Sequence, residues 1–244
     1  MGSRREQVLQ AGDTLNLGPA QASILFTGEE VRARIREMAA SLRERLGDEC
    51  PVFVGLLHAG FVFLADLIRA FDAPHEIDFL KVSRYDPAHR EPTAVRVLMD
   101  LRGEVRGRTV VVVEAIRAQG TKIEYVERFL RLRGPRRILY CALVVPEQAN
   151  RAVPIDEVGF VLRSRVGGRT AGGAAAIETP GAVIGSAGAA FATAGTGSAG
   201  PASAEPGQYV IGYGLDYRER YRHLDCIATL AMPPEEPVFA RGVA

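Results

Sequence analysis

The chain has almost no excess charge of either sign, because 30 lysine and arginine residues balance 29 aspartate and glutamate residues for a net charge of +1. This balance argues against nucleic acid or a membrane surface as the main partner. Hydrophobic runs are short, and neither a signal peptide nor a stretch long enough to cross a bilayer is visible. We therefore expect a cytoplasmic protein that binds neither nucleic acid nor membrane.

Cysteine is also scarce, and the three residues of this type lie far apart at Cys50, Cys141 and Cys226. They form no CxxC spacing, which removes the usual sequence pattern of a zinc site or a redox pair. An odd set of cysteines beside apolar runs is typical of free thiols in a reducing compartment. We expect these thiols to be buried and unpaired.

One stretch near the middle of the chain combines a buried strand, a glycine-bearing loop and a helix. The run of β-branched residues from Thr109 to Val113 predicts a fully buried strand. Apolar residues at helical spacing from Ile123 to Arg133, ended by Gly134, predict a helix. A loop that enters a helix in this way turns backbone N–H groups toward an anion. The same pattern also fits an ordinary strand-to-helix turn.

A strand, a small-residue turn and a helix also occur earlier in the chain. A capping box from Thr27 to Glu30 begins a helix that runs from Gly28 to about Gly47. A buried strand from Val52 to Leu57 then leads through the turn His58–Gly60 into a helix from Phe61 to Phe71. This repetition predicts an α/β protein with a parallel sheet, whose functional loops lie at the carboxyl ends of the strands.

Further short apolar runs predict strands at residues 77–82, 95–99, 137–145, 158–162 and 226–232. The first two form a hairpin whose polar loop, residues 83–92, is long enough to close over a site. We divide the chain into a weakly patterned leader (1–26), a folded domain (27–166 and 209–232), an Ala/Gly-rich insertion (167–208) and a tail (233–244). The insertion has few large apolar residues, which predicts disorder.

Several stretches together resemble successive blocks of the hypoxanthine-guanine phosphoribosyltransferases, in that family's order. The resemblance implies a type I phosphoribosyltransferase fold, with a flexible loop, a small hood over the base, and pairing into homo-dimers or tetramers. It also implies phosphoribosyl diphosphate or a nucleotide as the phosphorylated ligand. The matching stretches are Pro51–Ile68, Val95–Leu101, Val110–Glu114, Val158–Phe160 and Val210–Arg222.

The chain departs from the family where the resemblance places the chemistry. The family closes its central strand with two acids that hold the ribose hydroxyls, and here these positions are Glu114 and Ala115. The family's loop aspartate, which exchanges a proton with the purine, is replaced by Ala118. Its lysine that donates to the purine 6-oxo group falls at Val145, which cannot donate. The two acid-base groups that we predict to be catalytic are Glu114 and His58.

The remaining site residues are also implied by the resemblance. The turn that binds diphosphate is His58, Ala59 and Gly60, and Tyr85 stands at the entrance of the flexible loop. Tyr209 replaces an aromatic residue that stacks on the base, with Val210 beside it. Asp216 matches an aspartate that meets Mg²⁺, the implied cofactor, and Arg222 matches an arginine that contacts diphosphate. The phosphate loop retains or gains Arg117, Gln119, Gly120, Thr121 and Lys122.

These features leave three hypotheses open. The protein is a phosphoribosyltransferase with a changed, non-purine acceptor in specialised metabolism; or it keeps the fold and the phosphate loop but performs different chemistry; or it is a non-catalytic nucleotide sensor or partner subunit. The retained Glu114, Asp216 and Arg222 favour the first two hypotheses. The lost acids at positions 115 and 118 and the lost donor at position 145 favour the last two. Each of Tyr209, Asp216 and Arg222 also has a purely structural interpretation, as core, turn and surface residues.

Overall fold

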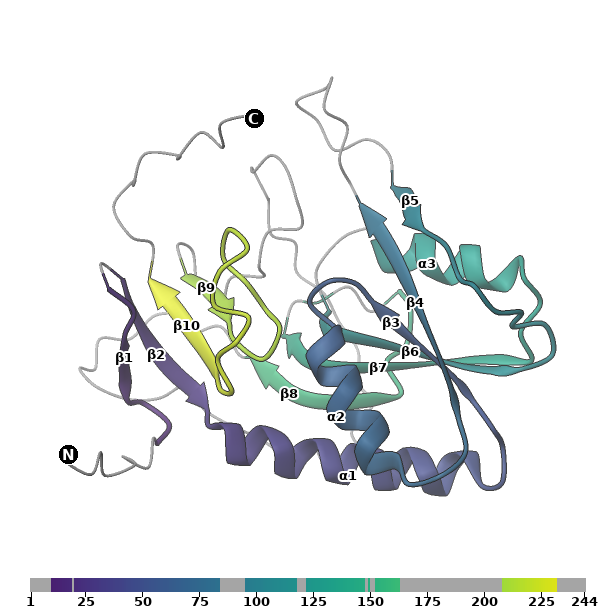
Figure 1. Cartoon of the computed structure of the whole chain (residues 1–244), viewed down its shortest axis with the longest axis horizontal. Coiled ribbons are helices and arrows are strands. Elements are labelled where there is room, and N and C mark those ends of the chain that lie inside the picture. Colours follow the sequence, from purple (N-terminus) through teal and green to yellow (C-terminus); the bar gives the residue numbers. More distant parts are fainter. Residues whose placement is uncertain are drawn as a thin grey trace, which may run out of the picture.

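The computed structural model describes residues 10–18, 20–83, 95–117, 122–147, 149, 152–162 and 208–231, and these form two sheets (Figure 1). The larger sheet has six strands in the order β5-β4-β3-β6-β7-β8. All neighbours in it are parallel except β5, which pairs antiparallel with β4. The predicted parallel α/β architecture is confirmed. The strands are β3 (Val52–Leu56), β4 (Glu76–Ser83), β5 (Arg96–Met99), β6 (Thr109–Ile116), β7 (Arg137–Pro146) and β8 (Glu157–Leu162).

Helices cover both faces of this sheet. Helices α1 (Gly28–Leu46) and α2 (Phe61–Phe71) pack against one face, and α3 (Lys122–Arg131) packs against the other. Alternate residues of β6 therefore enter different cores: Val111 and Val113 lie with α1 and α2, whereas Val110 and Val112 lie with α3. Burial on both faces explains why the four positions Val110–Val113 of this strand are all apolar.

The start of α1 is set locally, as the sequence predicts. The Thr27 side chain accepts a hydrogen bond from the Glu30 backbone N–H at 3.3 Å, and the Glu30 carboxylate accepts one from the Thr27 N–H at 2.7 Å. These two bonds satisfy backbone donors that the first turn of a helix leaves without intrahelical partners. The predicted capping box and helix are confirmed.

A second, four-stranded antiparallel sheet forms the hood, in the order β1-β2-β10-β9. Its strands are β1 (Thr14–Asn16), β2 (Gln21–Phe26), β9 (Gln208–Ile211) and β10 (Ile227–Ala231). Residues 14–16 and 21–26 belong to the predicted leader, so the interpretation of that segment as weakly patterned missed two strands. Strand β2 buries alternate side chains, and its partner β10 lies about 200 residues away, beyond the reach of local sequence patterns.

The thiol prediction holds for two cysteines and is wrong for the third. Cys141 and Cys226 are buried and free, and burial raises the pKa of both thiols. Cys50 is exposed, because it lies in the connection before β3 rather than inside the strand. No helix within the described ranges has both the length and the apolar character that a membrane span requires. The predicted loop 83–92 lies almost entirely outside the described residues, as does the insertion 167–208 except for Gln208.

Candidate functional site

The site is built at the edge of the large sheet where the parallel strands β3, β4 and β6 end. The turn after β3 begins with a cis peptide bond between Leu57 and His58. It then passes so close to the sheet that a Cβ at Gly60 would lie 2.8 Å from the Leu56 carbonyl oxygen and 3.1 Å from that of Val113. Only glycine fits such an approach without displacing backbone. The turn therefore lies directly against the end of β6.

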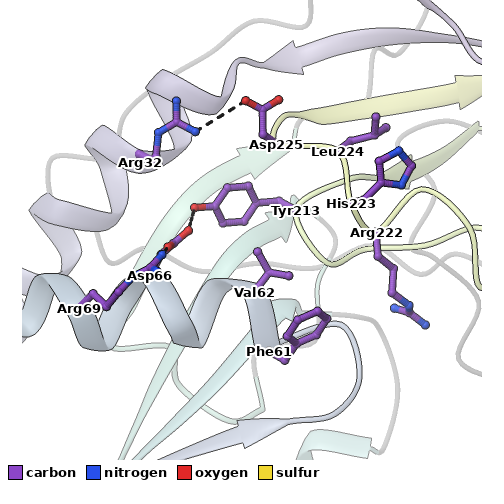
Figure 2. Close-up of a pocket in the computed structure, with 10 residues that line it drawn as sticks. All are labelled: Arg32, Phe61, Val62, Asp66, Arg69, Tyr213, Arg222, His223, Leu224 and Asp225. Carbon is purple, nitrogen blue, oxygen red and sulfur yellow. Dashed lines mark hydrogen bonds and ion pairs between the residues drawn. The ribbon is translucent and has the colours of Figure 1, made fainter.

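The hood loop between β9 and β10 packs onto this turn. Gly214 has a φ of +91°, and a Cβ there would lie 2.4 Å from the Ala59 carbonyl oxygen. Two more contacts attach the loop to the helices, as Figure 2 shows: the Tyr213 hydroxyl donates to Asp66 on α2, and Asp225 faces Arg32 on α1 at 3.7 Å. The hood and the predicted diphosphate turn are thus one packed unit.

Asp216 and Arg222, which the resemblance assigns to magnesium and diphosphate, are brought together in this loop. They bind each other: Arg222 Nη1 lies 2.8 Å from Asp216 Oδ1 and donates to the Gly214 carbonyl at 2.8 Å. Arg222 Nη2 lies 2.8 Å from Glu219 Oε2, and the second oxygen of Asp216 accepts the Glu219 N–H at 2.8 Å. The guanidinium group is therefore held by the loop itself.

These contacts test whether Asp216 fits a magnesium ion. Mg²⁺ prefers several oxygen ligands in octahedral geometry. Both carboxylate oxygens of Asp216 are engaged by other groups of the loop. Within the part of the chain that the structure describes, no group of three or more acidic, histidine or cysteine side chains is placed to hold a metal. Mg²⁺ is usually held by one or two carboxylates together with water and substrate phosphates, and magnesium at Asp216 stays a prediction.

A pair of basic groups lies beside the diphosphate turn, and the sequence pointed to only one of them. His58 is exposed, and its Nε2 lies 3.2 Å from the Nζ atom of Lys81 on β4. The parallel register explains the contact, because Leu56 pairs with Leu80 and both basic residues follow shortly after these positions. Lys81 is one of two lysines in the chain. That rarity was the only sequence signal that could have identified it.

The end of β6 differs most from expectation. Glu114 is 8% exposed and Arg117 is completely buried, and Arg117 Nε donates to Glu114 Oε1. Arg117 Nη1 also donates to the Val153 carbonyl at 2.9 Å, and its Cζ atom lies 5.3 Å from the centre of the Tyr140 ring. The prediction that Arg117 contacts the ligand is therefore corrected: its side chain points into the protein, where it pairs with the carboxylate of Glu114.

Burial and pairing act on the Glu114 carboxyl group in opposite directions. Burial raises its pKa, and the charge and hydrogen bond of Arg117 lower it, with a smaller lowering from Lys122; the net shift is upward. Arg117 Nη2 has no hydrogen-bond partner among the described residues. Such a pair is costly to desolvate and is held only while both partners are present. The one acid retained from the family's pair is thus engaged internally.

The predicted base-binding residues occupy two environments. Tyr209 is half-buried, and its ring lies 4.6 Å from that of Tyr217 inside the apolar cluster of the hood. The neighbouring Val210 faces the opposite way and is fully buried against the large sheet. Val145 is 2% exposed and pairs with Val161 of β8. Four predicted ligand residues lie outside the described part of the chain: Tyr85, Gln119, Gly120 and Thr121.

A parallel sheet, a hood and a diphosphate-type turn at their junction define the class as a type I phosphoribosyltransferase fold. Comparison with protein families agrees, because the model described as "Phosphoribosyl transferase domain" matches residues 21–170. The chain therefore belongs to the phosphoribosyltransferase family.

Individual relatives of known name are similar to this chain over most of its length. Hypoxanthine phosphoribosyltransferase from Salmonella typhimurium is 29% identical over 215 residues, which cover 87% of this chain and 97% of the relative. Hypoxanthine-guanine phosphoribosyltransferase from Mycobacterium bovis is 27% identical over 240 residues, covering 93% and 96%. The chain is thus similar, over nearly the whole length of both relatives, to proteins named as hypoxanthine or hypoxanthine-guanine phosphoribosyltransferases.

Solved structures of such proteins share the fold of this chain. A variant of hypoxanthine phosphoribosyltransferase from Trypanosoma cruzi, complexed with its product IMP, has a TM-score of 0.61 at 26% identity and covers 90% of this chain and 94% of that one. A Bacillus anthracis hypoxanthine-guanine phosphoribosyltransferase has a TM-score of 0.62 at 22% identity, covering 85% and 97%. The relatives are transferases, and the fold that they share with this chain spans nearly their whole length.

Proposed function

We propose that the protein transfers the phosphoribosyl group of phosphoribosyl diphosphate to a heterocyclic acceptor other than a 6-oxopurine. Membership of the family supports the transfer, and the junction of the turn 58–60 with Asp216 and Arg222 supports a donor that carries diphosphate. In this reaction an acceptor nitrogen bonds to C1 of the ribose, the bond from that carbon to diphosphate breaks, and the acceptor loses a proton. His58 is an exposed acid-base group at the turn.

The observation that carries the choice of acceptor is Val145. It stands where the resemblance places the family's donor to the 6-oxo group, and it is an apolar, buried side chain. A buried oxo group without a donor costs about 1–3 kcal/mol. The missing carboxylate at Ala118 adds to this, because a positioned general base contributes roughly 10²–10⁴-fold to rate. Both effects disfavour hypoxanthine and guanine, and we propose a non-purine or unusual heterocycle from specialised metabolism.

A second candidate is favoured by the pair of Glu114 and Arg117. If Glu114 stays bound to Arg117, the end of β6 offers no carboxylate to the ribose hydroxyls. The protein would then be a non-catalytic nucleotide-binding sensor or partner subunit, or would perform other chemistry on a phosphorylated ligand. This candidate predicts binding of monophosphates without consumption of phosphoribosyl diphosphate.

We also propose that the protein is cytoplasmic and forms a homo-dimer or tetramer. Phe61 and Ile77 are 45% and 46% exposed, and both line a groove of about 710 Å³ between α2 and β4. Large apolar side chains gathered in one groove favour association. Light scattering of the purified protein measures the oligomeric state, and a monomer at micromolar concentration would contradict this proposal.

The deciding experiment is a titration with phosphoribosyl diphosphate, with and without magnesium, followed by thermal unfolding and calorimetry. A ligand at 100 times its Kd stabilises the folded state by about 2.7 kcal/mol, which is readily detected. Binding of the diphosphate donor, followed by release of inorganic diphosphate with a heterocycle from an acceptor panel, would support the transferase. Binding of IMP, GMP or ribose 5-phosphate alone would favour the second candidate.

A further inference from the structure

We infer that Lys81 binds the diphosphate group of the substrate, and that Glu219 occupies the position of that group until the substrate displaces it. The inference rests on the proposed function, because it names two residues of the same site that the resemblance does not assign. Lys81 supplies a fixed positive charge beside His58, and Glu219 supplies a carboxylate that competes with the ligand.

The position of Lys81 is the first step. It lies on β4, beside the turn after β3, and its Nζ atom is 3.2 Å from His58 Nε2. An ammonium group has three N–H donors, and the contact with His58 uses one of them. A lysine at the family's diphosphate turn is a compact, fixed positive charge, whereas the charge of a histidine side chain changes with pH. Lys81 therefore brings the fixed charge to this turn from the neighbouring strand.

The position of Glu219 is the second step. Its carboxylate oxygen Oε2 lies 2.8 Å from Nη2 of Arg222, which the resemblance assigns to diphosphate. The hydrogen bond from Arg222 lowers the pKa of Glu219, and the charges of His58 and Lys81 lower it further. Three basic groups from β4, the turn and the hood loop thus act on one carboxylate. A carboxylate and a phosphate oxygen bind the same donors, so both favour the same place.

The position of Glu219 in the loop is consistent with a carboxylate that can release Arg222 when the ligand binds. Glu219 is exposed, and the residues Arg218, Glu219 and Tyr221 all have positive φ values, of 52°, 64° and 73°. Asp216 holds Arg222 independently through Nη1 at 2.8 Å. Loss of the Glu219 contact therefore frees Nη2 of Arg222 for the ligand while the guanidinium group stays in place.

Inorganic diphosphate is the probe, titrated calorimetrically into the full-length protein. We expect Lys81→Ala to weaken its binding by tenfold or more, and Lys81→Arg to stay within about threefold of the wild type, since charged hydrogen bonds contribute in this range. Glu219→Gln should strengthen binding several-fold, because it removes the competing charge. Arg106→Ala is the matched control: Arg106 is exposed, pairs with Glu104 and lies near the opposite edge of the sheet.

Weaker diphosphate binding by Lys81→Ala together with stronger binding by Glu219→Gln would support the inference. Unchanged affinity in Lys81→Ala, with a melting temperature like that of the wild type, would overturn the role of Lys81. If that variant does not fold, Lys81→Met tests the role of Lys81 instead. Equal diphosphate binding by Glu219→Gln and the wild type would overturn the proposal that the ligand displaces Glu219. Consumption of phosphoribosyl diphosphate with an unchanged KM in Lys81→Ala would refute the inference and leave the proposed function standing. Diphosphate binding that depends on Lys81, without transfer to any acceptor, would support the inference and contradict the proposed function.

Discussion

Replacing Arg117 by methionine should destabilise the protein strongly, because the change leaves the buried Glu114 carboxylate without its partner. Arg117 is completely buried, and its guanidinium group donates to Glu114 and to the Val153 carbonyl. Breaking a buried ion pair from one side typically costs about 3–5 kcal/mol. For a domain of this size, about 2–4 °C of melting temperature is lost per kcal/mol, so the expected decrease is roughly 6–20 °C.

The double variant Glu114→Val with Arg117→Met is the informative partner of this experiment. Apolar replacement of a whole buried pair is often close to neutral, so the double variant should recover most of the stability. The control Arg131→Met removes an exposed partner of Glu127 and should change stability by less than about 1 kcal/mol. Urea unfolding followed by circular dichroism gives all four free energies. If Arg117→Met lies within about 0.5 kcal/mol of the wild type, the buried pair does not exist in solution.

The pH dependence gives an independent check of the same pair. Burial holds the pKa of Glu114 above its ordinary value in the folded protein, and Arg117 opposes this rise. A group whose folded pKa is raised stabilises the protein at low pH, and this stabilisation is lost as the pH rises through the folded pKa. Without Arg117 the folded pKa rises further. The stability deficit of Arg117→Met should therefore be smaller near pH 5 than at pH 8, and an equal deficit at both would contradict the assignment.

Three further predictions concern the helix start, the hood and the acids that the chain lacks. Thr27→Ala should cost about 1 kcal/mol in thermal unfolding, and Thr27→Ser much less, because serine keeps the capping oxygen. Gly214→Ala should weaken binding of phosphoribosyl diphosphate and lower the melting temperature, since its Cβ would lie 2.4 Å from a carbonyl of the turn after β3. If the variant keeps the wild-type affinity and melting temperature, the hood does not pack closely against this turn. Ala115→Asp with Ala118→Asp should raise consumption of phosphoribosyl diphosphate with hypoxanthine, as a positioned base contributes roughly 10²–10⁴-fold, and no gain would mean that the base pocket has also changed.

Local sequence signals determined the elements whose cause is local. The capping box at Thr27 predicts the start of α1, and the β-branched run of β6 predicts a strand buried on both faces. The order of the family-like blocks then predicts the sheet, the hood and the turn at residues 58–60. Strand β2 escaped prediction because its stabilising partner is β10, and no pattern within a window of the chain reveals a pairing over 200 residues.

At the site, the sequence alone determined which residue types stand at the family's positions, and therefore what is missing at Ala115, Ala118 and Val145. Only the tertiary structure decided what the remaining charges do. Arg117 turns into the protein because Glu114, three residues before it, and the Val153 carbonyl, 36 residues after it, bind it there. Lys81 reaches His58 because the register of two parallel strands brings them to the same edge. The partner of a charged side chain depends on packing between distant segments, which residue spacing does not encode.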